Sequence, residues 1–359
     1  MIGICSVRFL SQEAWSCSVP VFRYALERWK PDPYKGIFIY RNEITQRDQA
    51  LLQQLEQAAL NPEYPLNLRI RKVDTASFSE DKLKELLKGQ VPEKLPVLAI
   101  WYPDQMGKKA PLWTVELTPS IAMALTDSPK RRLLAENLIK GESVVWIFVP
   151  SGNPEKDERA KALIKQELDF ASNALSKMPF YILSGYEQKK LTYGFPILTL
   201  SRTDPEERFL LDMLLNSESD LNEYRDEPMV FPVFGRGRLL GCLFGEYISK
   251  DKIQGAVSFL AGSCSCQVKA LNPGMDLLIA APWDMVVIES YVEDTPLPEL
   301  TGVMPGPASS IEQPATDPTD PDEPKKNTSV LVTYGITLSS VVVVVVFASL
   351  ILSHRRKRD

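Results

Sequence analysis

Apolar residues between positions 18 and 292 recur alternately with the period of a strand and with that of a helix. Short apolar runs, and a stretch in which Leu66, Leu68 and Ile70 alternate with polar residues, are typical of strands. Expected strands are 36–40, 66–70, 96–101, 112–117, 143–149, 195–200, 229–234 and 239–243. Apolar residues spaced for one helix face predict helices at 46–60, 79–88, 129–140, 157–175, 205–215 and 250–261. Each half therefore reads strand, helix, strand, helix, two strands, helix, which predicts an α/β fold.

Local signals support several of these boundaries. Thr45 and Ser128 stand where an N-cap residue is expected, and Gly141 follows a predicted helix end. The turn at 235–238 contains two glycines and predicts a hairpin between its neighbouring strands. Residues 19–29 alternate aromatic and charged side chains, which indicates an amphipathic helix packed on its own domain, or alternatively a partner-binding helix.

This repeated order of elements is similar to the thioredoxin fold. The likeness is greatest at 228–260, where Pro228 precedes the hairpin and a capped final helix follows. Thioredoxins carry a proline at that place, in the cis form and facing the active site, and Pro96 occupies it in the first half. The resemblance implies two tandem three-layer thioredoxin-like domains, at 18–141 and 142–292.

The redox motif of thioredoxins is absent from both halves. That motif is Cys-x-x-Cys at the start of the helix after the first strand, and the equivalent stretches here, 41–45 and 150–155, contain no cysteine. The chain also resembles an uncharacterised family of exported, membrane-anchored bacterial proteins at 19–29 and 264–278. That second resemblance implies export and a bacterial source, and it brings no known activity.

The C-terminal part of the sequence predicts a membrane anchor. Residues 293–326, here called the proline-rich stalk, contain eight prolines among acidic and small residues. Residues 327–353 carry no charge and are long enough to cross a bilayer as one helix. Residues 354–359 form a basic tail. We expect the membrane lipid to be a partner of this chain through the helix at 327–353.

The distribution of basic residues predicts the orientation of the anchor. Four Lys or Arg residues follow the span and two precede it, so the tail should be cytoplasmic and the bulk extracytoplasmic, at a bacterial cytoplasmic membrane. Residues 1–17 read as an incomplete signal segment, because Arg8 and Glu13 interrupt short apolar runs. The alternative is a tail-anchored protein whose bulk lies in the cytosol.

Composition excludes several kinds of chemistry. The only histidine, His354, stands at the edge of the predicted span, which excludes Ser-His-Asp, Cys-His and His-ligated zinc sites in the folded part. A net charge of −5 gives no reason to expect nucleic acid as a partner. No cofactor and no metal is expected. Carboxylates on helix faces, at Asp157, Glu158, Glu206 and Glu207, are interpreted as solvated.

Five cysteines remain as candidates for chemistry, and Cys5 would leave with a signal segment. Cys264 and Cys266 are candidate catalytic residues, because a Cys-x-Cys disulfide closes a strained ring that is easily reduced. The same two residues, with Cys17 and Cys242, are candidates for structural disulfides in an exported protein, and the sequence does not select a pairing.

Two functions follow from these observations. The favoured one is a membrane-anchored, extracytoplasmic binding or scaffolding protein without catalytic activity, with another protein as a possible ligand. The alternative is a membrane-tethered thiol–disulfide oxidoreductase that uses Cys264 and Cys266. A thioredoxin-like fold does not decide between them, because the same fold hosts catalytic and inert proteins.

Overall fold

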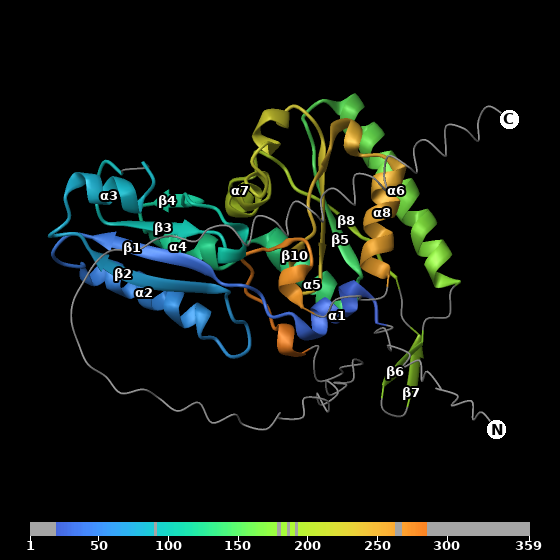
Figure 1. The fold of residues 1–359 in the computed structure, drawn as a ribbon, viewed down its shortest axis with the longest axis horizontal. Coiled ribbons are helices and arrows are strands. Elements are labelled where there is room, and N and C mark those ends of the chain that lie inside the picture. Colours follow the sequence, from blue (N-terminus) through green and yellow to red (C-terminus); the bar gives the residue numbers. More distant parts are fainter. Residues whose placement is uncertain are drawn as a thin grey trace, which may run out of the picture. The chain divides into compact units, whose positions relative to one another are not determined.

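The computed structural model describes residues 19–89, 92–177, 181–184, 187–190, 193–262 and 268–285 (Figure 1). The proline-rich stalk, the predicted span and the basic tail lie outside these ranges, as do residues 1–17. Among the helices that are described, none is long and apolar enough to cross a membrane.

The first sheet contains four strands in the order β2-β1-β3-β4. β1 (Tyr34–Tyr40) runs parallel to β2 (Leu68–Asp74) and antiparallel to β3 (Val97–Trp101), and β4 (Trp113–Val115) is antiparallel to β3. The peptide bond between Leu95 and Pro96, just before β3, is cis.

Helices cover both faces of this sheet. α2 (Gln46–Ala59) and α4 (Pro119–Thr126) pack on the face that carries Phe38, while α3 (Glu80–Leu86) packs on the face that carries Ile37 and Ile39. Since successive strand residues point to opposite faces, one apolar strand serves both layers. The result is a three-layer arrangement.

The second sheet has the order β12-β10-β9-β5-β8. β5 (Val144–Val149) is parallel to β8 (Ile197–Thr199) and antiparallel to β9 (Met229–Phe234), which pairs with both β10 (Arg238–Leu239) and β11 (Leu243–Phe244). β12 (Met275–Asp276) adds an antiparallel edge strand to β10. A separate hairpin consists of β6 (Tyr181–Ser184) and β7 (Glu187–Lys190).

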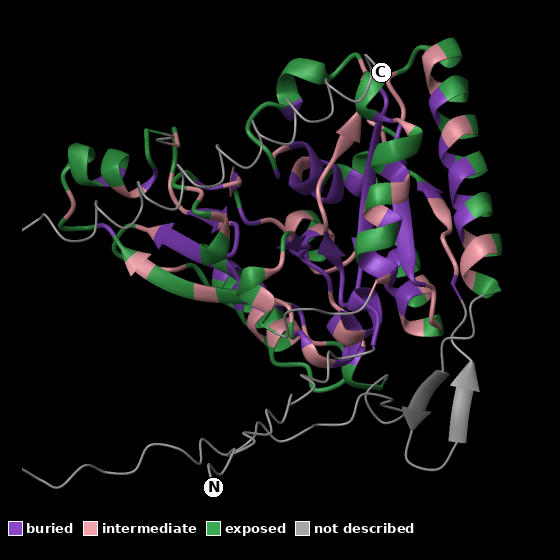
Figure 2. Cartoon of the chain, turned by 45° about the vertical axis from the view of Figure 1, so that its right-hand side comes forward, coloured by how far each residue is buried: buried purple, intermediate pink, exposed green. Residues whose placement is uncertain are grey.

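The strand β5 is buried on both faces, as expected for a central strand flanked by helices (Figure 2). Trp146 and its alternate neighbours contact α6 (Pro154–Ser176) and α8 (Lys250–Ala261). Ile147 and its alternate neighbours join the cluster that contains α5 (Pro129–Lys140) and α7 (Arg208–Leu215). The second sheet therefore also lies between two helical layers.

Both sheets place the first strand parallel to the second and antiparallel to the third, in the order second, first, third, fourth. This mixed α/β topology fits the thioredoxin-like fold that the order of elements predicted. The proline that precedes the third strand is cis only in the first half: among the described peptide bonds the Leu95–Pro96 bond is the one in cis, and Pro228 is trans.

Most predicted elements are present, with three differences. β2 begins at Leu68 rather than Leu66, because Leu66 forms an isolated bridge with Ala280. The helix α4, its N-cap Thr118, and the β6–β7 hairpin were not predicted. Short 3-10 turns complete the described part: η1 (Asp104–Met106), η2 (Pro205–Glu207), η3 (Leu221–Tyr224), η4 (Gly245–Tyr247) and η5 (Lys269–Leu271).

The predicted amphipathic helix is present as α1 (Val21–Arg28), but the prediction that it packs on its own domain, 18–141, is wrong. Its partners belong to the second half: the Val21 amide donates to the Gly262 carbonyl after α8 at 3.0 Å, and the Trp29 ring centroid lies 6.5 Å from that of Phe234 in β9. A helix that begins in the range assigned to the first domain therefore completes the core of the second.

The prediction that Glu207 is solvated is wrong. Its side chain is buried and accepts hydrogen bonds from the Ser128 hydroxyl and the Lys130 amide, both at 2.6 Å. Ser128 occupies the N-cap position of α5 as predicted, but its side chain binds Glu207 instead of the helix backbone. Glu207 thus supplies the anion that satisfies this helix N-terminus, from η2 rather than from the neighbouring sequence.

The two sheets share one hydrophobic core. The Tyr102 hydroxyl donates to the Met213 carbonyl at 2.9 Å, and the Trp113 ring packs edge-to-face on Phe209 with centroids 4.8 Å apart. Since these contacts join the end of β3 and β4 to α7, the described residues of both halves belong to one compact unit.

Candidate functional site

A pocket of about 580 Å³ lies beside the first turns of α6, which follows β5. In open α/β sheets ligands bind outside the carboxyl ends of the parallel strands, and β5 ends here. Three segments line this α6 pocket: the first three turns of α6, the segment that leads into β9, and the segment that follows β11. The lining residues are Lys156, Arg159, Ala160, Leu163, Tyr224, Glu227, Pro228 and 244–248.

The loop between β5 and α6 is closed by side-chain caps. The Asp157 carboxylate accepts from the Ser151 amide at 2.7 Å, from the Ser151 hydroxyl at 2.8 Å and from the Gly152 amide at 3.0 Å. The Asn153 side chain accepts from the Glu155 and Lys156 amides, both at 3.1 Å. The free amides that a helix N-terminus offers to an anion are therefore already occupied.

This capped loop occupies the place where a thioredoxin carries its thiols. Its hydroxyl, amide and carboxylate groups form hydrogen bonds with one another, and the loop contains no cysteine. The equivalent loop of the first sheet is capped as well: the Thr45 hydroxyl accepts from the Asp48 amide at 3.1 Å, and the Asn42 amide donates to Asp74 at 3.1 Å. In both loops the hydroxyl groups also donate to carboxylates: Ser151 to Asp157 at 2.8 Å and Thr45 to Asp48 at 2.7 Å.

Arg202 joins two segments beside the pocket. Its Nε donates to the Pro150 carbonyl at 2.7 Å and its Nη2 to the Glu227 carbonyl at 3.0 Å. The end of β5 and the segment before β9 are thereby held together by one guanidinium group, whose planar fork suits two carbonyls at once. The pocket is formed by elements whose mutual positions are set before any ligand arrives.

Three aromatic side chains form one side of the pocket, here called the aromatic wall. The Tyr224 ring lies 4.2 Å from that of Phe244, which lies 5.1 Å from that of Tyr247. Tyr224 is 38% exposed and Tyr247 59% exposed. Aromatic rings supply large, rigid contact area, and neither tyrosine hydroxyl has a hydrogen-bond partner within the described ranges.

The rim of the pocket carries balanced charge. Lys156 pairs with Glu227 at 2.5 Å, and Arg159 pairs with Glu155 at 2.8 Å, while Glu246 is exposed. Exposed pairs of this kind contribute little free energy and exchange partners easily. The arrangement favours a ligand with an apolar face and a few polar groups over a strongly charged one.

Of the four cysteines singled out from the sequence, only Cys242 falls in the described part. It lies between β10 and β11, half-buried, as a free thiol, and its amide donates to Glu218 at 3.0 Å. Burial and the Glu218 carboxylate raise the pKa of the Cys242 thiol, which keeps it protonated and unreactive near neutral pH. Cys17, Cys264 and Cys266 lie outside the described residues, so their pairing and the proposed redox chemistry remain predictions.

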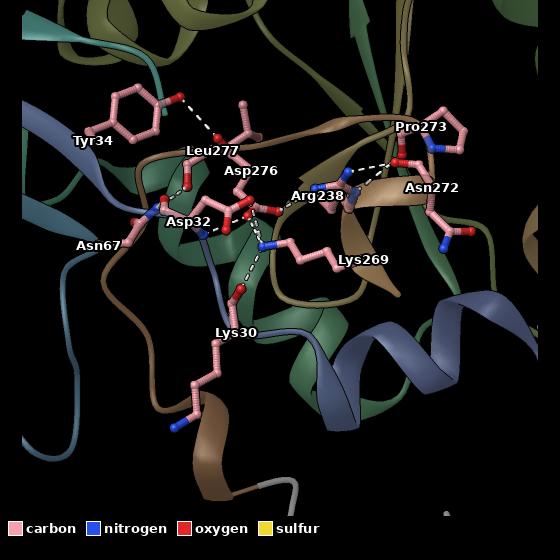
Figure 3. A network of polar contacts seen from close by, with 10 residues as sticks. All are labelled: Lys30, Asp32, Tyr34, Asn67, Arg238, Lys269, Asn272, Pro273, Asp276 and Leu277. Atoms are coloured by element: carbon pink, nitrogen blue, oxygen red, sulfur yellow. Dashed lines mark hydrogen bonds and ion pairs between the residues drawn. The ribbon is translucent and has the colours of Figure 1, made fainter. Parts of the chain in front are cut away.

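A second polar cluster, around the buried Asp276, joins the two sheets (Figure 3). Asp276 lies between Lys269 and Arg238 and accepts from the Asp32 amide at 2.6 Å, while Lys269 also pairs with Asp32 at 2.9 Å. The Tyr34 hydroxyl donates to the Asp276 carbonyl at 3.0 Å. Because every charge has a partner, this cluster is structural.

The residues of the aromatic wall were not predicted from the sequence. Their signal was indirect. In the predicted topology, the segment before the strand at 229–234 and the segment after the strand at 239–243 both approach the carboxyl end of the strand at 143–149. Aromatic residues in those two segments, at Tyr224, Phe244 and Tyr247, could have been selected on that ground. Within the described ranges, no cluster of three or more His, Cys, Asp or Glu residues could hold a metal ion.

Comparisons with known proteins give little beyond the fold. No protein-family model matches the chain, and no curated protein matches it. Among solved structures, the chain is similar to human ERp44 in its zinc-bound form, with 9% sequence identity and a TM-score of 0.20. The match covers 68% of this chain and 58% of the ERp44 chain, which is less than two thirds of that protein. At these values the likeness supports no statement about activity or ligands.

Proposed function

We propose that this chain is a non-catalytic binding protein whose ligand occupies the α6 pocket. The observation that carries the proposal is the contrast between the two sides of that pocket. The loop that would bear catalytic thiols is capped by Asp157 and Asn153, whereas the opposite side is an aromatic wall with two exposed tyrosines. Small-ligand and peptide sites typically combine apolar walls with a few fixed polar groups.

We further propose that the chain is anchored in a bacterial cytoplasmic membrane by residues 327–353, with its folded part outside. The uncharged span and the basic tail that follows it support this topology. Protease added to intact spheroplasts should digest the folded part and spare the tail. Digestion only after lysis would instead favour the tail-anchored alternative.

The absence of catalysis is tested by thiol–disulfide exchange. We expect the full chain to leave the rate of insulin reduction by glutathione unchanged, and Cys264→Ser and Cys266→Ser to have no effect on that rate. An acceleration that disappears with either substitution would contradict the proposal and establish the oxidoreductase alternative.

Ligand binding at the α6 pocket is tested with a photo-reactive side chain. p-Benzoylphenylalanine in place of Tyr247 should crosslink efficiently to whatever fills the pocket of the full chain in its membrane. The matched control has the same group in place of Phe170, which is 61% exposed on α6 but does not line the pocket. Equal, background crosslinking at both positions would contradict a binding function for this pocket.

A further inference from the structure

The strand β2 leaves one edge of the first sheet open. It stands at one end of the order β2-β1-β3-β4, so among the described strands only β1 pairs with it (Figure 1). It has seven residues, whereas the other edge strands of the two main sheets, β4, β8 and β12, have two or three. Proteins usually shorten or cover such edges, because a row of free backbone groups pairs readily with another chain. A long open edge is therefore a candidate for strand addition.

The free backbone groups of this edge belong to alternate residues. The register of β2 against β1 is continuous over Leu68–Asp74, and the Thr75 amide, directly after it, donates to the Tyr40 carbonyl at 2.8 Å. Because backbone groups along an edge strand point alternately toward and away from their partner strand, odd-numbered residues bond to β1 here. The N–H and C=O groups of Ile70 and Lys72 therefore point outward, and no hydrogen bond within the described ranges occupies them.

The chain itself covers only the start of this edge. Leu66 forms an isolated antiparallel bridge with Ala280, and the Asn67 side chain donates to the Leu277 carbonyl at 3.1 Å. Four of the six residues from 69 to 74 are exposed, and the other two are half-buried. Residues 69–74, here called the open edge, are thus accessible to an incoming strand.

Two arginines give the open edge a preference for an acidic partner. Arg69 and Arg71 project from the same face of the sheet, because they stand two residues apart on one strand. Both are exposed, and within the described part of the chain neither side chain forms an ion pair or a hydrogen bond. Two cations without carboxylate partners, beside outward backbone groups, match an extended segment that carries acidic side chains.

The same charge disfavours a second copy of this chain as the partner. Antiparallel pairing of two open edges about Ile70 would place Arg69 of each copy opposite Arg71 of the other, and like charges at such positions destabilise a sheet. Acidic residues opposite the two arginines are favourable instead. The residue between them would lie beside Ile70, which packs against the hydrophobic core. The matching segment therefore has two acidic residues that flank an apolar one.

We propose that the open edge of β2 binds an extended acidic segment of another protein by strand addition, with an acidic–apolar–acidic run beside Arg69, Ile70 and Arg71. The bound segment continues the four-stranded sheet through backbone hydrogen bonds to Ile70 and Lys72. These bonds supply affinity, while the two arginines select the sequence and the register. The α6 pocket lies beside the second sheet, so this surface adds a second partner to the proposed binding function.

The probe is the peptide Thr-Val-Glu-Val-Glu-Val-Thr, blocked at both ends. It is titrated into the full chain, held in detergent micelles and dye-labelled through an N-terminal tag, and binding is measured by microscale thermophoresis. We expect a Kd below about 1 mM, and binding about tenfold or more weaker for the peptide with glutamine in place of both glutamates. The doubly substituted chain, Arg69→Glu and Arg71→Glu, should instead prefer the peptide with lysine in place of both glutamates.

Substitutions at Lys72 separate strand addition from simple charge attraction. Lys72→Pro removes an outward N–H and keeps the ladder with β1, because an edge strand tolerates proline where its nitrogen faces solvent. This variant should bind the glutamate peptide about tenfold or more weakly than the parent chain. The matched control, Lys72→Ala, keeps the N–H and loses only an exposed pair with Glu56, so it should bind within about twofold of the parent.

Several results would overturn the proposal. No binding at about 1 mM peptide, or equal binding of the glutamate and glutamine peptides, would contradict an acidic partner. Equal binding by Lys72→Pro and Lys72→Ala, with both unfolding at the urea midpoint of the parent, would show charge attraction without strand addition. A dimer of the parent chain that Lys72→Pro dissociates would assign the edge to a second copy.

Two further points keep the test decisive. If Lys72→Pro lowers the urea midpoint, the exchange of charges between chain and peptide decides alone, because Arg69 and Arg71 are exposed. Crosslinking from position 247 reports on the α6 pocket and does not involve β2. Failure of strand addition is therefore distinguishable from failure of the proposed function.

Discussion

At the scale of single residues, two adjacent arginines have opposite roles. Arg131 is buried, and its Nη1 donates to the Leu125 carbonyl at 2.9 Å and the Leu278 carbonyl at 3.1 Å. Burial lowers the pKa of Arg131 to about 10, so it is still charged at neutral pH. Arg132 is exposed and pairs with Asp127. The buried arginine satisfies carbonyls from distant segments, whereas its neighbour makes only a surface pair.

Replacing each of these two arginines by methionine should change the stability of the protein by very different amounts. Arg131→Met should lower the free energy of unfolding by about 3–5 kcal/mol, because it leaves the buried carbonyls of Leu125 and Leu278 without their donor. Arg132→Met should change it by less than about 1 kcal/mol. Urea unfolding followed by tryptophan fluorescence measures both, and equal losses would show that the buried network is not stabilising.

Cys242 gives a second prediction at this scale. Because the pKa of its thiol is raised in the folded state, the thiolate fraction at pH 8 is smaller than in an unfolded chain. Alkylation of Cys242 by iodoacetamide should therefore be roughly tenfold or more slower in the native protein than in urea. Peptide-resolved mass spectrometry measures the two rates. Comparable rates would mean that Cys242 is a reactive thiol after all.

At the scale of elements, α6 depends on its capped N-terminus. The Asp157 carboxylate accepts three hydrogen bonds from Ser151 and Gly152, so it holds the loop that replaces the thiol motif. The helix itself is favoured by its apolar spacing, with Ile164, Leu168 and Ala171 buried on one face. The cap positions the pocket, and the apolar face attaches the helix to the sheet.

Removing the carboxylate that holds this loop should be measurable. Asp157→Ala should destabilise the protein by about 1–3 kcal/mol, because the Ser151 and Gly152 amides lose their acceptor. The neighbouring Glu158→Ala, at an exposed position, should change stability by less than about 0.5 kcal/mol. Hydrogen exchange of the 150–160 amides should rise only in Asp157→Ala. A uniform rise in both variants would contradict the role given to Asp157.

At the scale of the whole molecule, the two sheets are coupled by a shared core and by the Asp276 network. Asp276 binds groups more than 200 positions away in sequence, such as the Asp32 amide. Buried charges of this kind are costly to separate, because each partner would remain unpaired in a low-dielectric interior. The described unit should therefore unfold as one body.

This coupling predicts a single unfolding transition for the two sheets. β1 and β5 should lose protection from hydrogen exchange at the same urea concentration, although they belong to different sheets. Asp276→Ala should lower that midpoint for both strands, with a loss of about 3–5 kcal/mol, whereas Asp104→Ala, in an exposed pair with Lys35, should hardly change it. Separate midpoints for β1 and β5 would show two independent domains.

Much of the fold was accessible from the sequence because its signals are local. The N-cap Thr45, the αL glycine at 141 and the continuous apolar run of β5 each act within a few residues. The repeated order of elements then suggested the topology of both sheets. Glu207 was misjudged because its partners, Ser128 and Lys130, are nearly 80 positions away.

The sequence by itself determined most of the elements, their order, the absence of a thiol motif in two expected loops, and the uncharged segment at 327–353. Periodicity and composition suffice for these, since each depends on neighbouring residues. Only the tertiary structure decided that α1 packs on the second sheet, that Asp276 joins the halves, and that Tyr224, Phe244 and Tyr247 form one wall. An apolar stripe shows which side of an element is covered, but the covering surface is set by the folded chain as a whole.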